Sequence, residues 1–266
     1  MANTKIVTFT GSKGGVGKTT ILFNISSWLA TNSKKILLID ADFQASLSST
    51  FNVITNQHTL LDVFMGGEPT VRHVAENIDL IPASPNLDQV ETLIQGKMFR
   101  EYMLLNWMHK NEDLIYTYDY VFIDTHPEFS MLTKNMIAVS DAVIVPLEPS
   151  EYGFTQLKNQ FELRMAEFRE ASIDPRTNTS DIDAQVFFVG SKARTTTTSS
   201  RLFREELLSI PNNIGVIKFS EIMPTSTFTK VAVTNMSADK LRSYKGYKDH
   251  LVDEFSKIQR VIDNLN

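Results

Sequence analysis

The sequence has no cysteine, only two tryptophans and no long apolar run among its 266 residues. Without cysteine, it cannot form a disulfide scaffold, a thiolate-ligated zinc or iron–sulfur site, or a cysteine nucleophile. No segment approaches the roughly 20 consecutive apolar residues that a transmembrane helix needs. The N-terminal segment MANTKIVTFTGSK also lacks the apolar core and the cleavage site of a secretory signal. These absences favour a cytoplasmic protein.

Apolar residues make up 42% of the chain, which is enough to build a hydrophobic core. Several short apolar runs, rich in β-branched or aromatic residues, alternate with longer amphipathic segments. Runs that are apolar on both faces are typical of strands buried in a parallel sheet. The predicted strands are Lys5–Thr10, Lys35–Ile39, Ile78–Ile81, Tyr120–Ile123, Ala142–Pro146, Gln185–Val189 and Ile214–Phe219.

Helical patterns lie between these strands. Apolar side chains at helical spacing predict helices over Thr19–Ala30, around Leu157–Met165 and over Lys248–Leu265. Alternating strands and helices indicate right-handed crossovers, and therefore an α/β fold with a doubly wound, mostly parallel sheet flanked by helices. No linker rich in proline, glycine or serine divides the chain, so we expect a single domain over residues 1–266.

A glycine-rich loop directly follows the first predicted strand and opens the first predicted helix. Glycines let the backbone turn tightly and bring several N–H groups toward phosphate oxygens, while the helix N-terminus adds partial positive charge. In such a loop, Lys18 would contact the β- and γ-phosphates and the Thr19 hydroxyl would bind Mg²⁺. The standard form of the loop has glycine where this chain has Ser12. The loop reads Lys13-Gly14-Gly15-Val16-Gly17-Lys18-Thr19-Thr20.

This loop resembles the deviant Walker A loop, K-G-G-x-G-K-[ST], of P-loop ATPases of the ParA/MinD type. The resemblance implies a P-loop NTPase fold, ATP and Mg²⁺ as ligands, and slow, partner-stimulated ATP hydrolysis. It also implies that the additional lysine, Lys13, reaches the ATP of the other chain in a homodimer. A cation supplied in this way would stabilise charge on the γ-phosphate and make hydrolysis depend on dimerisation.

Two acidic residues, Asp40 and Asp42, follow the second predicted strand. At positions i and i+2, they should point to the same side, over the crevice at the carboxyl end of the sheet. The family's D-x-D-P-Q pattern begins 22 residues after the loop lysine, and Asp40 lies 22 residues after Lys18. The resemblance implies that Asp42 positions or activates the attacking water, that Asp40 supports Mg²⁺ binding and that Gln44 is the switch glutamine. Phe43 departs from the family's proline.

A third acidic residue, Asp124, ends the apolar run Tyr120–Ile123. This Walker B arrangement uses a buried strand to hold one carboxylate near Mg²⁺, usually through water. His126 follows where relatives usually carry proline or a small residue. We interpret His126 as a residue behind the site or on the surface rather than as a catalytic base, because Asp42 already fills the water-positioning role.

The segment Val145–Tyr152 resembles the family's V-P-x-x-x-E-Y segment. In the family, this segment contributes to dimer contacts and to the response to nucleotide. An ordinary strand-to-helix loop, with a glutamate placed favourably in the first helical turn, explains the same residues equally well.

Basic residues are concentrated near the C-terminus of an acidic chain. The whole chain has a net charge of −5, but Ser191–Lys248 carries ten basic and four acidic residues. This stretch is therefore +6 and the remainder −11, which suggests a face for phosphate backbones. The resemblance adds that the arginine of Ala193-Arg194-Thr195 contributes to non-specific DNA binding; scattered solvated charges are the alternative. The candidate DNA contacts are Arg194, Arg201, Arg204 and Lys230.

As a whole, the resemblance is closest to the small ParA ATPases that partition plasmid or chromosome DNA. It implies an ATP-dependent homodimer that binds nucleoid DNA non-specifically and is stimulated by a centromere-binding adaptor protein. The catalytic residues would be Lys13, Lys18 and Asp42. Only four residues precede the first predicted strand, so we expect no N-terminal helix-turn-helix domain.

A MinD-like ATPase that positions itself on membranes is the alternative. It would need a C-terminal amphipathic helix with a basic polar face. Residues 249–265 instead carry four acidic residues against Lys257 and Arg260. We therefore expect no stable membrane binding. An iron–sulfur reductase of the same superfamily is excluded, because it needs cluster cysteines.

Overall fold

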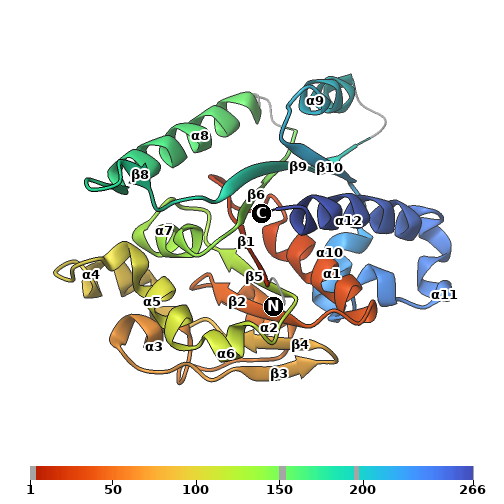
Figure 1. Cartoon of the computed structure of the whole chain (residues 1–266). Helices are drawn as coiled ribbons and strands as arrows, with labels where there is room; N and C mark the ends of the chain where they lie inside the picture. The colour runs from red at the N-terminus through yellow and green to blue at the C-terminus, as the bar shows by residue number, and fades with distance from the viewer. Residues whose placement is uncertain (1–3, 150–153, 195–197, 266) are drawn as a thin grey trace.

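An eight-stranded sheet forms the centre of the computed structural model, which describes residues 4–149, 154–194 and 198–265 (Figure 1). Neighbouring strands run parallel except at one edge, where β3 pairs antiparallel with β4. The sheet order is β10 (Asn213–Lys218), β9 (Gln185–Ala193), β6 (Ala142–Leu147), β1 (Lys5–Phe9), β5 (Tyr120–Thr125), β2 (Ile36–Ala41), β4 (Ile78–Ile81) and β3 (Arg72–Ala75).

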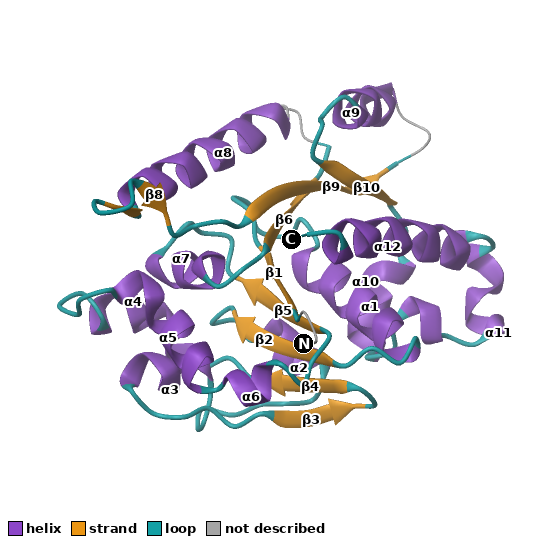
Figure 2. Cartoon of the chain, in the orientation of Figure 1, coloured by secondary structure: helices purple, strands orange, loops and turns teal. Residues whose placement is uncertain are grey.

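Helices cover both faces of this sheet (Figure 2). One face packs against α1 (Lys18–Thr31), α10 (Ile222–Thr229) and α12 (Tyr247–Asp263). The other face packs against α3 (Leu60–Met65), α4 (Val90–Leu93), α5 (Met103–Lys110), α6 (Glu112–Ile115), α7 (Met131–Ala138), α8 (Phe154–Ala171) and α9 (Thr198–Leu208). Shorter elements include α2 (Ser46–Thr50), α11 (Ala238–Leu241) and the hairpin of β7 (Ile173–Asp174) with β8 (Thr179–Ser180).

The predicted fold class is confirmed, and each predicted strand is present. The edge strand β3 was missed because only two of its four residues are apolar and none is fully buried. Strands β5 and β9 also continue beyond their predicted ends, to Thr125 and Ala193. Polar residues in these extensions interrupt the apolar pattern, although the strand conformation continues to the carboxyl edge of the sheet.

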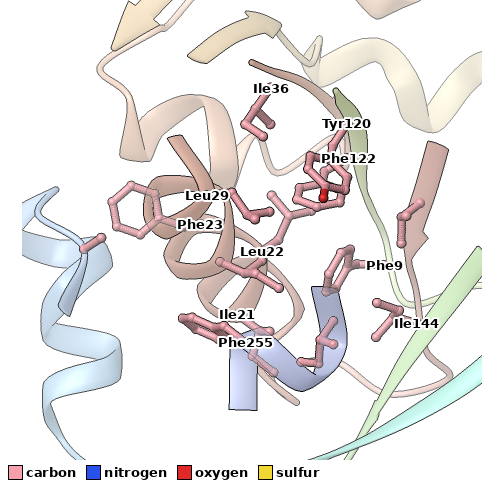
Figure 3. Packing of buried hydrophobic residues seen from close by; sticks show 14 of the residues in the cluster. Phe9, Ile21, Leu22, Phe23, Leu29, Ile36, Tyr120, Phe122, Ile144 and Phe255 are labelled. Carbon is pink, nitrogen blue, oxygen red and sulfur yellow. The ribbon is translucent and has the colours of Figure 1, made fainter. Parts of the chain in front are cut away.

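The core follows the two-residue period of the strands. In β5, Tyr120 and Phe122 face the layer that contains α1, whereas Val121 and Ile123 face the opposite layer. Figure 3 shows the first of these layers, where Phe122 lies near Leu22 of α1. Each central strand is therefore apolar on both faces, as the sequence predicted.

Helix α12 joins the C-terminal part of the chain to this core. Its apolar stripe, which includes Leu251, Phe255 and Ile258, is completely buried. Its polar side chains also satisfy backbone N–H groups of the edge strand β10, because Val216 N donates to Glu254 at 2.8 Å and Lys218 N donates to His250 at 3.2 Å. These contacts protect an edge that would otherwise be open to pairing with another strand.

No helix in the described parts of the chain is long and apolar enough to cross a membrane.

Phe255→Ala tests how strongly α12 depends on its buried stripe. Phe255 packs near Trp28 of α1, with 5.9 Å between ring centroids. Its truncation should lower the free energy of unfolding by about 3–5 kcal/mol, because the lost ring leaves a cavity. Phe228→Ala is the matched control, since Phe228 is 87% exposed and its truncation should change stability little. Urea titration measures both, and equal losses would contradict this view of the packing.

Candidate functional site

The glycine-rich loop lies between β1 and the start of α1, at the centre of the carboxyl edge of the sheet (Figure 1). Gly15 and Gly17 have φ values of 76° and 95°, in the left-handed region that favours glycine. A Cβ added at Gly17 would also come within 3.2 Å of the Ser191 hydroxyl. The Val16 side chain is buried. The loop therefore has the tight, glycine-dependent conformation that the sequence predicted.

The end of β9 restrains this loop through two hydrogen bonds to its carbonyl groups. The Ser191 hydroxyl donates to the carbonyl of Val16 at 2.7 Å, and the Lys192 ammonium donates to the carbonyl of Gly15. Neither residue was predicted at the loop from the sequence, where Lys192 was only one of the basic residues of the stretch Ser191–Lys248. Both lie in the polar extension of β9, so only the continued strand brings them to the loop.

Two buried carboxylates lie next to each other beside the loop. Asp40 of β2 and Asp124 of β5 are register partners in neighbouring parallel strands, and both are 0% exposed. The Thr19 hydroxyl donates to Asp124 Oδ2 at 2.5 Å. Lys18 is also buried; desolvation lowers its pKa, and the charges of Asp124 and Asp42 partly oppose that effect. The structure thus brings together residues that are far apart in the sequence.

Asp40 organises the segment that follows β2. Its Oδ2 accepts hydrogen bonds from the backbone N–H and the hydroxyl of Ser48, both at 2.7 Å, and its Oδ1 accepts from Asp42 N at 3.2 Å. Burial raises the pKa of Asp40 to about 6, although these hydrogen bonds favour the charged form. Ser48 was not identified from the sequence. A supporting role of Asp40 in Mg²⁺ binding stays a prediction.

Asp124 has the properties of a residue that a cation would stabilise. Burial and, to a lesser extent, the Asp40 charge raise its pKa to about 8, although the Thr19 hydrogen bond and the Lys18 charge oppose this rise. Its Oδ1 is buried without a hydrogen-bond partner in the described chain. No cluster of three histidine or acidic side chains suited to a metal occurs within the described residues. Thr19 and Asp124 therefore fit Mg²⁺ that takes its remaining ligands from phosphate and water.

Asp42 lies just beyond the end of β2 and is nearly buried. Its Oδ1 accepts hydrogen bonds from Gln44 N at 2.9 Å and from His126 Nδ1 at 3.1 Å. The His126 ring contacts the ring of Phe43, with centroids 4.3 Å apart and planes 36° apart. His126 thus contacts Asp42 and is one of the residues that line the cavity over the loop. That it does not act as a catalytic base stays a prediction.

Lys13 pairs with a residue of its own chain. Its ammonium contacts Glu148, just after β6, and Glu148 also lies 3.3 Å from the Lys192 ammonium. The Lys13 side chain is half exposed. In the segment Val145–Tyr152, Glu151 and Tyr152 lie outside the described residues.

A cavity of about 810 Å³ opens over the loop, which is large enough for a nucleotide. It collects most of the predicted loop residues together with Asp42. It also includes Thr227 and Phe228 from the end of α10 and Lys230 after it, which the sequence analysis had not linked to the loop. Its lining includes Gly14, Gly15, Gly17, Lys18, Thr19, Thr20, Asp42, Gln44, His126, Phe228 and Lys230.

The four candidate DNA contacts do not form one cluster. Arg201 and Arg204 lie on α9, and Arg194 follows β9, where its guanidinium lies 4.5 Å from the Phe219 ring centroid. Lys230 instead lines the cavity over the loop, where its ammonium contacts Asn52. Thr195, next to Arg194, lies outside the described residues. DNA contact by these residues stays a prediction.

Comparison with known proteins shows which sequences and structures this chain is similar to. A family model described as an AAA domain matches residues 4–174. The chromosome partitioning protein ParA of Caulobacter vibrioides is 35% identical over 184 residues, which are 65% of this chain and 66% of the relative. A plasmid partition protein from Borrelia burgdorferi has a similar structure, with a TM-score of 0.73 and 22% identity over 97% of this chain and 98% of that one.

A protein that is not named for partitioning also has this fold. Cobyrinic acid a,c-diamide synthase from Mycobacterium smegmatis, solved with an ATP analogue and magnesium, matches with a TM-score of 0.77 and 20% identity. The match covers 97% of this chain and 94% of that one. At such identities, structural similarity shows the fold alone.

Asp40→Asn tests whether Asp40 is buried at an energetic cost. Because the folded-state pKa of about 6 exceeds the ordinary value of 3.8, the wild type loses stability as pH rises between these values. The variant should therefore gain about 2–3 kcal/mol relative to the wild type between pH 4 and 6 in nucleotide-free protein. Asp183→Asn, at an exposed acid, is the control. Urea titrations at several pH values measure the free energy of unfolding. If it changed with pH equally in Asp40→Asn and in the wild type, burial of Asp40 would carry no such energetic cost.

Proposed function

Because the chain belongs to the ParA/MinD-type family of P-loop ATPases, we propose that it is a partition-type ATPase that hydrolyses ATP with Mg²⁺ in the cavity over the loop. The main support is one juxtaposition: Lys18, Thr19 and Asp42 line the same cavity, and Asp124 bonds to Thr19. Relatives named for partitioning add support, since the match to the Caulobacter protein includes 65% of this chain.

In this proposal, the residues of the site have separate roles. Backbone N–H groups and the buried Lys18 ammonium bind the phosphates. Thr19 and Asp124 hold Mg²⁺, which when bound neutralises negative charge on the phosphates. Asp42 orients the water, because its Oδ1 is already held by Gln44 and His126. Within the described residues, no hydrogen bond involves its Oδ2, which remains able to accept from water.

Dimerisation, DNA binding and an adaptor protein belong to the same proposal. The half-exposed Lys13 at the start of the loop would reach the ATP of a second chain. Arg194, Arg201 and Arg204 would contact DNA phosphates, which carry no base information, so binding should tolerate any sequence and weaken with salt. A centromere-binding adaptor would stimulate hydrolysis and release the DNA.

Co-sedimentation with DNA tests the proposal directly. The protein should sediment with DNA in Mg·ATP but not in Mg·ADP or without nucleotide, and binding should fall steeply as salt rises. Liposomes of anionic lipid, run in parallel, test the MinD-like alternative. Liposome binding without DNA binding would overturn the partition function in favour of membrane positioning.

Lys13→Gln tests the role of this lysine. The variant should bind ATP and stay folded, but lose ATP-dependent dimers and at least about tenfold of the hydrolysis rate, because a charge contact in the transition state is missing. Analytical ultracentrifugation measures the dimers. If the variant formed ATP-dependent dimers as readily as the wild type does, Lys13 would not act on the partner's ATP.

Glu148→Gln tests the pairing of Lys13 within its own chain. Lys13 must leave Glu148 to reach a partner, so loss of the charged pair should let ATP-dependent dimers form at a protein concentration about two- to fivefold lower. Glu128→Gln is the matched control, since its exposed carboxylate does not contact Lys13. An unchanged dimerisation curve would mean that the pair does not restrain Lys13.

A further inference from the structure

Two unusual residues of the site contact each other. Phe43 stands where the family pattern has proline, and His126 stands where relatives carry proline or a small residue. The two are separated by more than 80 positions, yet their rings stack, with centroids 4.3 Å apart. The contact joins the loop after β2, where Phe43 follows Asp42, to the loop after β5, where His126 follows Asp124 by two positions.

The stacked pair holds Asp42 at one oxygen. A carboxylate only accepts hydrogen bonds, so His126 Nδ1 carries the hydrogen that it donates to Asp42 Oδ1 at 3.1 Å. Gln44 N donates to the same oxygen at 2.9 Å. Two donors on one oxygen restrain rotation of the carboxylate. Asp42 also lines the cavity over the loop, so its other oxygen, Oδ2, is left to accept from water there.

Phe43 in turn restrains the histidine. It is half-buried and packs against the apolar cluster on the α3–α7 side of the sheet. The His126 side chain is only 18% exposed, and its second nitrogen is 3.9 Å from the exposed carboxylate of Glu128, too far for a hydrogen bond. The ring therefore gets its orientation from Phe43 on its face and Asp42 at its edge. Proline would restrain this loop through its backbone; here ring stacking does so.

We infer that His126, held against Phe43, is a positioning residue that orients the Asp42 carboxylate toward the water in ATP hydrolysis. The inference rests on the proposed ATPase function. It separates two quantities that a general loss of structure would change together: the rate of hydrolysis depends on the orientation of Asp42, whereas nucleotide affinity depends mainly on the glycine-rich loop and Lys18.

Two pairs of variants test this inference. His126→Ala removes the donor, and His126→Asn keeps an N–H donor at a similar distance from the backbone. Phe43→Ala removes the stacking ring, and Phe43→Tyr keeps it. His109→Ala, at an exposed histidine on α5, is the control. Hydrolysis is measured on dimers at saturating Mg·ATP, and nucleotide dissociation constants are measured separately.

His126→Ala should slow hydrolysis about tenfold and leave the nucleotide dissociation constant within about twofold. His126→Asn should recover to within about threefold of the wild type. Phe43→Ala should slow hydrolysis by about three- to tenfold, whereas Phe43→Tyr should hydrolyse ATP at close to the wild-type rate. Equal rates in His126→Ala and wild type, or equal losses in His126→Ala and His126→Asn, would overturn the inference. A parallel loss of nucleotide affinity would also overturn it, because it indicates general disruption.

Nitrogen NMR of the nucleotide-free protein gives a readout that does not depend on activity. The His126 ring should show a protonated Nδ1, and Asp42→Ala should change this signal while the His109 signal stays constant. An unchanged His126 signal in Asp42→Ala would show that the contact is absent in solution. Failure of the proposed function would look different: the wild type itself would hydrolyse no ATP, with or without DNA.

Discussion

The site depends on two carboxylates that parallel strand pairing forces side by side. Asp40 and Asp124 are register partners at the carboxyl edge of the sheet, and both are completely buried. Like charges in such a place repel each other and lose their hydration, so each needs its own compensation. Asp40 receives it from Ser48 and Asp42 through hydrogen bonds. Asp124 receives only the Thr19 hydroxyl and the nearby Lys18 charge, which makes it the acid that a cation would stabilise.

The remaining parts of the site are arranged around this pair by the ends of other strands. The glycine-rich loop follows β1, which lies between β5 and β6 in the sheet. The end of β9 holds the loop through Ser191 and Lys192, and the end of β6 supplies Glu148 to Lys13. A site at the carboxyl edge of a doubly wound sheet is the expected location for a ligand. In this protein, five strand ends contribute to it.

Residues of the candidate site come both from the part of the chain that the family model covers and from beyond it. The family model ends at residue 174, and this region contains the loop and all three acidic residues of the site. Arg194, Arg201 and Arg204 lie beyond it, on β9 and α9 or next to them. Cobyrinic acid a,c-diamide synthase shares the fold at 20% identity, so the fold does not determine the reaction.

The sequence by itself determined the fold class, the glycine-rich loop and the three acidic residues, because each is encoded by neighbours along the chain. A buried strand has its apolar run, and the loop has its glycines between a strand and a helix. Only the tertiary structure decided which distant residues complete the site. Ser191 at Val16, Glu148 at Lys13 and His126 at Asp42 are each separated by more than 80 positions. No local pattern encodes such pairs, since parallel pairing and strand extension bring them together only when the whole sheet has formed.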